Sequence, residues 1–148
     1  MKIKVAWIGK TKEEAIEALT EEYLKRIGRY VPVERVTVSN EADLLAKFGT
    51  ASKSAGKSTL VILDSRGKEF SSEQFAKFLG DYQDRNPLPL VFAIGGADGF
   101  SAQARSIAQH VISLGKMTLP HELARVVLLE QVYRAFTILA GHPYHSGH

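Results

Sequence analysis

Short apolar segments typical of strands alternate five times with segments typical of helices, and this alternation restricts the possible folds more than any other feature. The expected strands are residues 2–8, 31–38, 59–63, 90–94 and 110–114, and the expected helices are residues 12–27, 41–53, 72–82, 102–108 and 120–140. A repeated strand–helix order is typical of an α/β domain with a mainly parallel sheet and helices on both faces. At 148 residues the chain is expected to form a single domain, residues 1–148.

Local start and stop signals support these boundaries. Thr11 is expected to cap the first helix and Gly28 to end it, and either Ser71 or Ser72 is expected to cap the third helix. Residues 64–68 are rich in charged and small residues, so they are expected to form a turn directly after the third strand.

Composition excludes several classes of protein. The chain has no cysteine, which excludes disulfide bonds, thiolate metal sites and a cysteine nucleophile. No apolar stretch approaches the roughly 20 residues that span a bilayer, and the first residues enter a strand pattern without a signal sequence. We therefore expect a soluble, cytoplasmic protein that does not associate with membranes. The net charge of +3 permits an anionic partner but is equally typical of an ordinary solvated surface.

Three strand ends have the composition of ligand-binding loops: residues 63–67, 94–99 and 114–119. Ligands of open α/β sheets bind at the carboxyl ends of strands. The glycines within 94–99 allow positive φ and close approach of the backbone to a ligand, although glycine-rich turns also occur without one. The three loops are therefore candidates for a shared binding site.

The glycine-rich turn does not match the common phosphate-binding motifs. Its spacing is neither G-x-G-x-x-G nor that of a P-loop, and Asp98 inside the turn would repel a phosphate. A nucleoside di- or triphosphate is therefore disfavoured. A ligand with an adenosine part and no phosphate fits better, and S-adenosylmethionine (SAM), with its cationic sulfonium, is one such ligand.

The last expected helix is apolar nearly all round. A helix of this kind is buried on more than one face. One face can pack on the sheet and the other then needs a partner, which favours a dimer. The alternative is a central helix in the core of a monomer. The apolar residues are Leu123, Ala124, Val126, Val127, Leu128, Leu129, Val132, Tyr133, Phe136, Ile138 and Leu139.

Four segments together closely resemble the RlmH family. They are IGGADG at 94–99, MTLPHELAR at 117–125, EQVYRA at 130–135 and HPYH at 142–145. This family comprises bacterial methyltransferases that act on N3 of a pseudouridine in large-subunit (23S) ribosomal RNA, within the SPOUT superfamily of α/β-knot methyltransferases. The resemblance extends over essentially the whole chain, because length and element order agree as well.

The resemblance implies a fold, a cofactor and partners. The fold would be of the SPOUT type, with a deep C-terminal trefoil knot. The protein would be a homodimer in which the partner's C-terminal tail completes each site, and its substrate would be the assembled ribosome. SAM would be the methyl donor, with no metal required. By position, the SAM-binding residues would be Leu63, Gly95, Leu114, Gly115, Lys116, Met117, Thr118 and Leu119.

The resemblance also assigns chemistry to the last helix and the tail. Pseudouridine N3 is protonated at neutral pH, so its proton must be removed, or the anion stabilised, as N3 attacks the methyl carbon. His142, Tyr144 and His145 are the catalytic candidates on the tail, and histidine has a pKa suited to a base. Arg134 is expected to contact RNA phosphate or the target base, or else to pair with Glu130 at i,i+4.

Two further residues and two further functions stay open. Arg125 is expected to contact RNA or the dimer partner, and His121 to cap or pack at the start of the last helix. One alternative function is a SPOUT methyltransferase that acts on tRNA. The other is a non-catalytic ribosome-binding module, against which the intact 114–119 loop and the intact tail argue.

Overall fold

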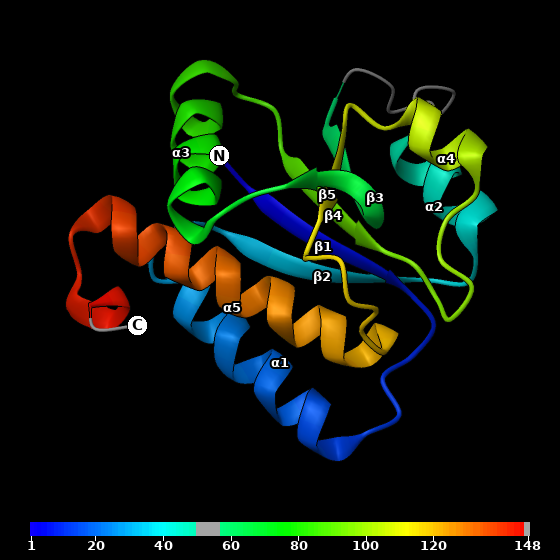
Figure 1. The fold of residues 1–148 in the computed structure, drawn as a ribbon, viewed down its shortest axis with the longest axis horizontal. Helices are drawn as coiled ribbons and strands as arrows, with labels where there is room; N and C mark the ends of the chain where they lie inside the picture. Colours follow the sequence, from blue (N-terminus) through cyan, green and yellow to red (C-terminus); the bar gives the residue numbers. More distant parts are fainter. Residues whose placement is uncertain (50–56, 147–148) are drawn as a thin grey trace.

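A five-stranded parallel sheet forms the centre of the molecule (Figure 1). The computed structural model describes residues 1–49 and 57–146. Within them every strand pair is parallel, in the order β2-β1-β4-β3-β5, so the predicted α/β class with a mainly parallel sheet is confirmed. The strands are β1 (Ile3–Ile8), β2 (Val33–Val38), β3 (Thr59–Glu69), β4 (Leu90–Ile94) and β5 (His110–Ser113).

Helices cover both faces of the sheet, as predicted (Figure 1). Three helices cover one face: α1 (Glu14–Ile27), α3 (Ser72–Arg85) and α5 (His121–Ala140). Two shorter helices cover the other: α2 (Glu41–Phe48) and α4 (Ala102–Ile107). A single 3-10 turn, η1 (Pro143–His145), follows α5. No helix among the described residues is both long and apolar enough to cross a membrane.

Two hydrophobic cores result from the alternation of side chains along the strands. On β1, Trp7 points into the larger core under α1, α3 and α5, whereas Ala6 points into the smaller core under α2 and α4. On β4, Phe92 and Ala93 divide in the same way. The larger side chains lie on the side of the longer helices, and all of β4 is buried.

β3 is longer than expected, and the turn predicted at residues 64–68 is wrong. The strand continues to Glu69, but its pairing with β5 slips, because both Leu63 and Lys68 align with Ile112. The intervening residues bulge out of the ladder, which explains their turn-like composition. At Gly67 the strand crosses β5 so closely that a Cβ would lie 2.6 Å from the carbonyl carbon of Val111.

Of the predicted helix signals, those at the start of α3 and the end of α1 are confirmed. Ser71 accepts a hydrogen bond from the backbone N–H of Gln74 and forms a capping box with it, and Gly28 ends α1. The prediction for Thr11 is wrong, because Glu13 is the N-cap of α1 and gives no side-chain cap. The second helix ends at Phe48 with Gly49 as its C-cap, and residues 50–53 of its predicted range lie outside the described residues.

The apolar surface of α5 is covered mostly within its own chain. The helix packs on the sheet and lies between α1 and α3, so no second chain is needed to bury its flanks (Figure 1). The all-round apolar character of α5 is therefore explained within one chain, as in the alternative of a central helix in the core of a monomer. Leu123 and Leu139 remain 41% and 45% exposed. The homodimer and the trefoil knot stay predictions.

We expect Gly67→Ala to destabilise the protein by about 2 kcal/mol, because the added methyl would overlap backbone atoms of β5, which cannot move aside as a flexible side chain can. Urea denaturation measures this change. Gly96→Ala is the matched control, since a Cβ there meets only the Ile8 side chain, at 3.8 Å. Equal stability of the two variants would contradict a close crossing of β3 and β5.

Candidate active site

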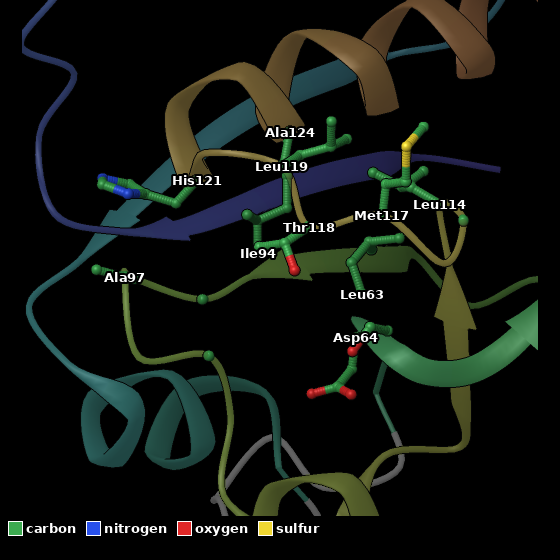
Figure 2. Close-up of a pocket in the computed structure, with 15 residues that line it drawn as sticks. Leu63, Asp64, Ile94, Ala97, Leu114, Met117, Thr118, Leu119, His121 and Ala124 are labelled. Carbon is green, nitrogen blue, oxygen red and sulfur yellow. The ribbon is translucent and has the colours of Figure 1, made fainter.

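A pocket lies where the bulge in the middle of β3 and the carboxyl end of β4 meet the segment between β5 and α5 (Figure 2). The three strands lie side by side in the order β4-β3-β5, and their parallel direction brings the following residues to one edge of the sheet. The start of α5 closes the pocket on the remaining side. The lining residues are Leu63, Asp64, Ser65, Ile94, Gly95, Gly96, Ala97, Gly99, Leu114, Gly115, Met117, Thr118, Leu119, His121 and Ala124.

Most of the predicted cofactor-binding residues line this pocket. They are Leu63, Gly95, Leu114, Gly115, Met117, Thr118 and Leu119. Lys116 is exposed and is not among the lining residues. Asp64 and Ile94, which belong to the predicted loops 63–67 and 94–99, also line the pocket, whereas sequence reasoning did not assign His121 or Ala124 to it. The position of these two residues in the first turn of α5, shortly after the predicted loop 114–119, was the available signal.

The backbone of the two main loops is fixed in conformations that suit glycine. Gly115 has φ 138°, a region that other residues rarely adopt. The Ser113 hydroxyl donates to the carbonyl oxygen of Gly115 at 2.8 Å and accepts from its N–H at 3.0 Å, which pins the start of this loop. At Gly95 a Cβ would lie 3.1 Å from the Gly99 carbonyl carbon. The glycines of both loops therefore leave backbone groups open to the pocket, beside apolar side chains such as Leu114 and Leu119.

The pocket has one acidic side chain among its described lining residues. The carboxylate of Asp64 is only 7% exposed, and Arg105 and Arg66, 3.7 and 3.8 Å from its oxygens, offset its charge. None of the described lining residues is lysine or arginine. Asp98, expected to repel a phosphate, is exposed and does not line the pocket. The pocket thus combines apolar walls with one carboxylate, which suits a neutral or cationic ligand better than a polyphosphate.

The predicted catalytic residues gather at the opposite end of α5. Arg134 lies on the last turns of the helix, and His142, Tyr144 and His145 belong to the tail at or next to η1 (Figure 1). With 20 residues in α5, about 30 Å of helix separates its two ends. One chain therefore does not bring its own tail to its own pocket.

Glu130 joins two of these residues. Its carboxylate accepts hydrogen bonds from Nε and Nη2 of Arg134 at 2.8 and 2.6 Å, which confirms the i,i+4 pair that the sequence allowed. The same carboxylate oxygen accepts from the Tyr144 hydroxyl at 3.3 Å. The Tyr144 ring packs edge-on against Tyr133, with centroids 4.7 Å apart, and lies 5.3 Å from the Arg134 guanidinium. The tail is thereby attached to α5 of its own chain.

This environment favours a donor role for Tyr144. Burial raises the pKa of its phenol well above the usual value, and a hydrogen bond with Tyr23 and the negative charge of Glu130 act in the same direction. The hydroxyl therefore stays protonated at neutral pH and donates hydrogen bonds. On the same turn, His142 Nδ1 accepts from the Tyr144 N–H at 3.1 Å, whereas buried His145 Nδ1 has no hydrogen-bond partner among the described residues.

The expectation that Arg125 contacts RNA or a dimer partner is wrong. Its side chain is fully buried inside its own chain, because it hydrogen-bonds the end of β1 and the loop that follows. His121 does not cap α5, whose N-cap is Pro120, but lines the pocket. The described residues contain no group of three or more His, Cys, Asp or Glu that could hold a metal ion.

We expect Tyr144→Ala to speed amide hydrogen exchange at Tyr144 and Ser146 by at least about tenfold, because the ring that packs on Tyr133 holds η1 in place. Tyr144→Phe is the matched variant: it keeps the ring and loses only the hydroxyl, so its effect should be smaller. Exchange at Val132, in the buried part of α5, should not change. Unaltered exchange in the tail of Tyr144→Ala would show that the ring does not attach it.

Sequence comparison agrees with the predicted family. The family described as "Predicted SPOUT methyltransferase" matches residues 1–145. A Koribacter versatilis (strain Ellin345) protein named "Ribosomal RNA large subunit methyltransferase H" is 53% identical over 148 residues, which cover 100% of both chains. A protein of the same name from Geobacter sulfurreducens is 41% identical over 152 residues, covering 98% of this chain and 99% of the relative.

Solved structures share the fold at low sequence identity. A probable methylase family protein from Haemophilus influenzae Rd KW20 has a TM-score of 0.61 at 9% identity, covering 98% of this chain and 70% of that one. The SpoU methyltransferase AviRb from Streptomyces viridochromogenes has a TM-score of 0.55 at 16% identity, covering 94% and 60%. These likenesses concern the fold alone. The family match and the full-length relatives show that the chain belongs to the SPOUT methyltransferases and, within them, to the ribosomal RNA large subunit methyltransferase H (RlmH) family.

Proposed function

We propose that this protein is a SAM-dependent methyltransferase that methylates N3 of a pseudouridine in 23S ribosomal RNA on the assembled ribosome. The observation that carries the proposal is the pocket of three strand-end loops in a chain 53% identical, over its full length, to a protein named for large-subunit ribosomal RNA methylation. Six of the residues that the resemblance matched to SAM lie in one run of sequence, 114–119, and five of those six line the pocket.

The pocket fits the cofactor that SPOUT methyltransferases use, which is SAM. Its apolar side chains, among them Leu63, Ile94 and Leu119, suit an adenine ring, and the glycines leave backbone groups open to polar atoms. Asp64 lies at the edge of the pocket, but Arg105 and Arg66 offset its charge, so it is the lack of lysine and arginine among the described lining residues that disfavours a polyphosphate. When bound, SAM supplies an electrophilic methyl group, whose bond to sulfur breaks as the bond to N3 forms.

A homodimer explains why the two sets of site residues lie at opposite ends of α5. The pocket uses His121 and Ala124 at the start of the helix, and the tail follows its end. In a two-fold dimer the tail of one protomer reaches the pocket of the other, so each site draws residues from both chains. Met117, which lines the pocket and is 86% exposed, and the exposed Leu123, next to the lining residue Ala124 in sequence, suit burial against the partner.

The tail residues then have distinct roles. Tyr144 donates a hydrogen bond and positions the tail, because its phenol stays protonated. His142 and His145 are the candidates for removing the N3 proton, which needs a base that is neutral near pH 7. Arg134, oriented by Glu130, stabilises the negative charge on the deprotonated base or contacts an RNA phosphate.

Methyl transfer from labelled SAM to ribosomes that lack the modification tests this function. We expect label on a pseudouridine of assembled ribosomes and little on free ribosomal RNA or tRNA. His145→Ala and Arg134→Ala should keep the fold and lower the transfer rate at least about 100-fold. Label mainly on tRNA would support the tRNA alternative. Ribosome binding that is indifferent to SAM, without transfer, would support a non-catalytic module.

Complementation tests the shared site. Ala124→Phe fills the pocket, and His145→Ala removes a tail group, so each homodimer should be inactive. After subunit exchange, half of the dimers are mixed, and each mixed dimer has one site with an intact pocket and an intact partner tail. We expect about a quarter of the wild-type activity to return. A mixture that stays inactive, although mass spectrometry shows mixed dimers, would contradict a tail that acts on the partner's pocket.

A further inference from the structure

Arg125, on the second turn of α5, is a fully buried cation that forms no ion pair among the described residues. Burying a guanidinium without an anion is unfavourable unless neutral acceptors replace its water. The closest acidic residue on the same helix, Glu122, is occupied elsewhere, by backbone N–H groups. A buried charge of this kind adds little net stability, and its role is to fix the position of the groups that it hydrogen-bonds.

Arg125 holds the end of β1 and the loop after it. Nη2 donates to the carbonyl oxygens of Ile8 at 3.0 Å and Gly9 at 3.3 Å, and Nη1 donates to the Thr11 hydroxyl at 3.0 Å. The guanidinium also lies 5.0 Å from the centroid of the Trp7 ring. The rigid fork of the guanidinium reaches all three acceptors at once, which lysine cannot do in the same geometry.

Glu122 holds the other end of the same loop. Its Oε1 accepts from the backbone N–H of Lys12 at 2.9 Å and from that of Glu13 at 3.2 Å. These two N–H groups precede the first turn of α1, where hydrogen bonds within the helix do not satisfy them, and the N-cap residue gives no side-chain hydrogen bond. The Arg125 guanidinium therefore donates hydrogen bonds to the carbonyls at the start of residues 8–13. The Glu122 carboxylate accepts hydrogen bonds from the backbone N–H groups at the end of the same segment. We call this set of contacts the α5–β1 clamp.

The clamp joins two walls of the pocket. On α5, the pocket-lining residues His121 and Ala124 lie within one turn of Arg125. On the other side, Ile8 lies at the end of β1, next to β4. The Ile8 side chain is the nearest neighbour that a Cβ added at Gly96 would have. Gly96 itself lines the pocket. Arg125 and its acceptors thus set the distance between two sides of the pocket: the start of α5 and the glycine-rich loop that contains Gly96.

We propose that Arg125 is a positioning residue for the cofactor pocket. It touches neither the pocket space nor RNA, and it acts by fixing the start of α5 against the end of β1. This inference rests on the proposed function, because the ligand that it serves is SAM. Loss of the clamp should weaken cofactor binding without unfolding the protein, since an apolar side chain of similar length can fill the buried space left by arginine.

Calorimetric titration with S-adenosylhomocysteine, the demethylated product, measures this effect without turnover. We expect its dissociation constant to rise at least about tenfold in Arg125→Met, which leaves the Ile8 and Gly9 carbonyls without donors. Arg125→Lys should fall between Arg125→Met and the wild type. Thr11→Val, on a residue that does not line the pocket, should raise the constant by a smaller factor, because it removes only one acceptor.

Val132→Ala is the matched control. Val132 is fully buried on the same helix and does not line the pocket, so its loss should lower the melting temperature and leave product affinity unchanged. In methyl-transfer kinetics, Arg125→Met should raise the KM for SAM more than the KM for ribosomes. Wild-type affinity in Arg125→Met and Thr11→Val, measured well below their melting temperatures, would overturn the inference.

The same titration separates this inference from the proposed function. A wild-type protein that binds neither SAM nor S-adenosylhomocysteine would overturn the proposed function, and the role of Arg125 with it. If the wild type binds the ligand and all clamp variants bind it equally tightly, the role of Arg125 is overturned and the proposed function is not. If Arg125→Met does not fold, Thr11→Val and Arg125→Lys still decide the question, because both keep the buried volume nearly unchanged.

Discussion

Parallel pairing of β4 between β1 and β3 is the constraint on which the rest of the structure depends. All five residues of β4 are buried, so the strand is held from both faces by the two cores and from both edges by its neighbours. Because each pair is parallel, the carboxyl ends of β1, β4, β3 and β5 share one edge of the sheet. The segments that follow these strands meet there whatever their own sequence. A rigid frame can therefore carry loops whose composition is set by the ligand rather than by folding.

α5 connects the sheet to both groups of candidate site residues. Its first turns lie beside the pocket, its middle packs on the sheet between α1 and α3, and its last turns support the aromatic and charged cluster around Tyr144. Most buried positions of the helix are apolar, but Arg125 is a buried cation and Thr137 a buried hydroxyl. Polar groups along the helix thus help to fix the segments at its two ends, which are the pocket at its start and the tail at its end.

The sequence was sufficient for the fold class, for the order of elements and for most of the pocket, because these depend on periodicity and on glycine-rich strand ends. It was not sufficient where a local pattern has two physical outcomes. Residues 64–68 have the composition of a turn and form a bulge, because β5 pairs with β3 on both sides of them. Thr11 has the chemistry of an N-cap, yet its hydroxyl bonds Arg125, over 100 residues away in sequence. Arg125 itself looked like a surface cation, because sequence does not show which arginine finds backbone carbonyls inside the protein.

The position of η1 relative to the pocket has a consequence for how this protein can vary. One uninterrupted helix joins the two regions, so the length of α5 sets the distance between them. Inserting a single residue into that helix would turn everything beyond it by about 100° and shift it by about 1.5 Å. Surface loops can gain or lose residues without such an effect. The number of residues from His121 to Ala140 therefore fixes how the tail is placed relative to the pocket, even where the side chains on the surface of the helix are exchanged.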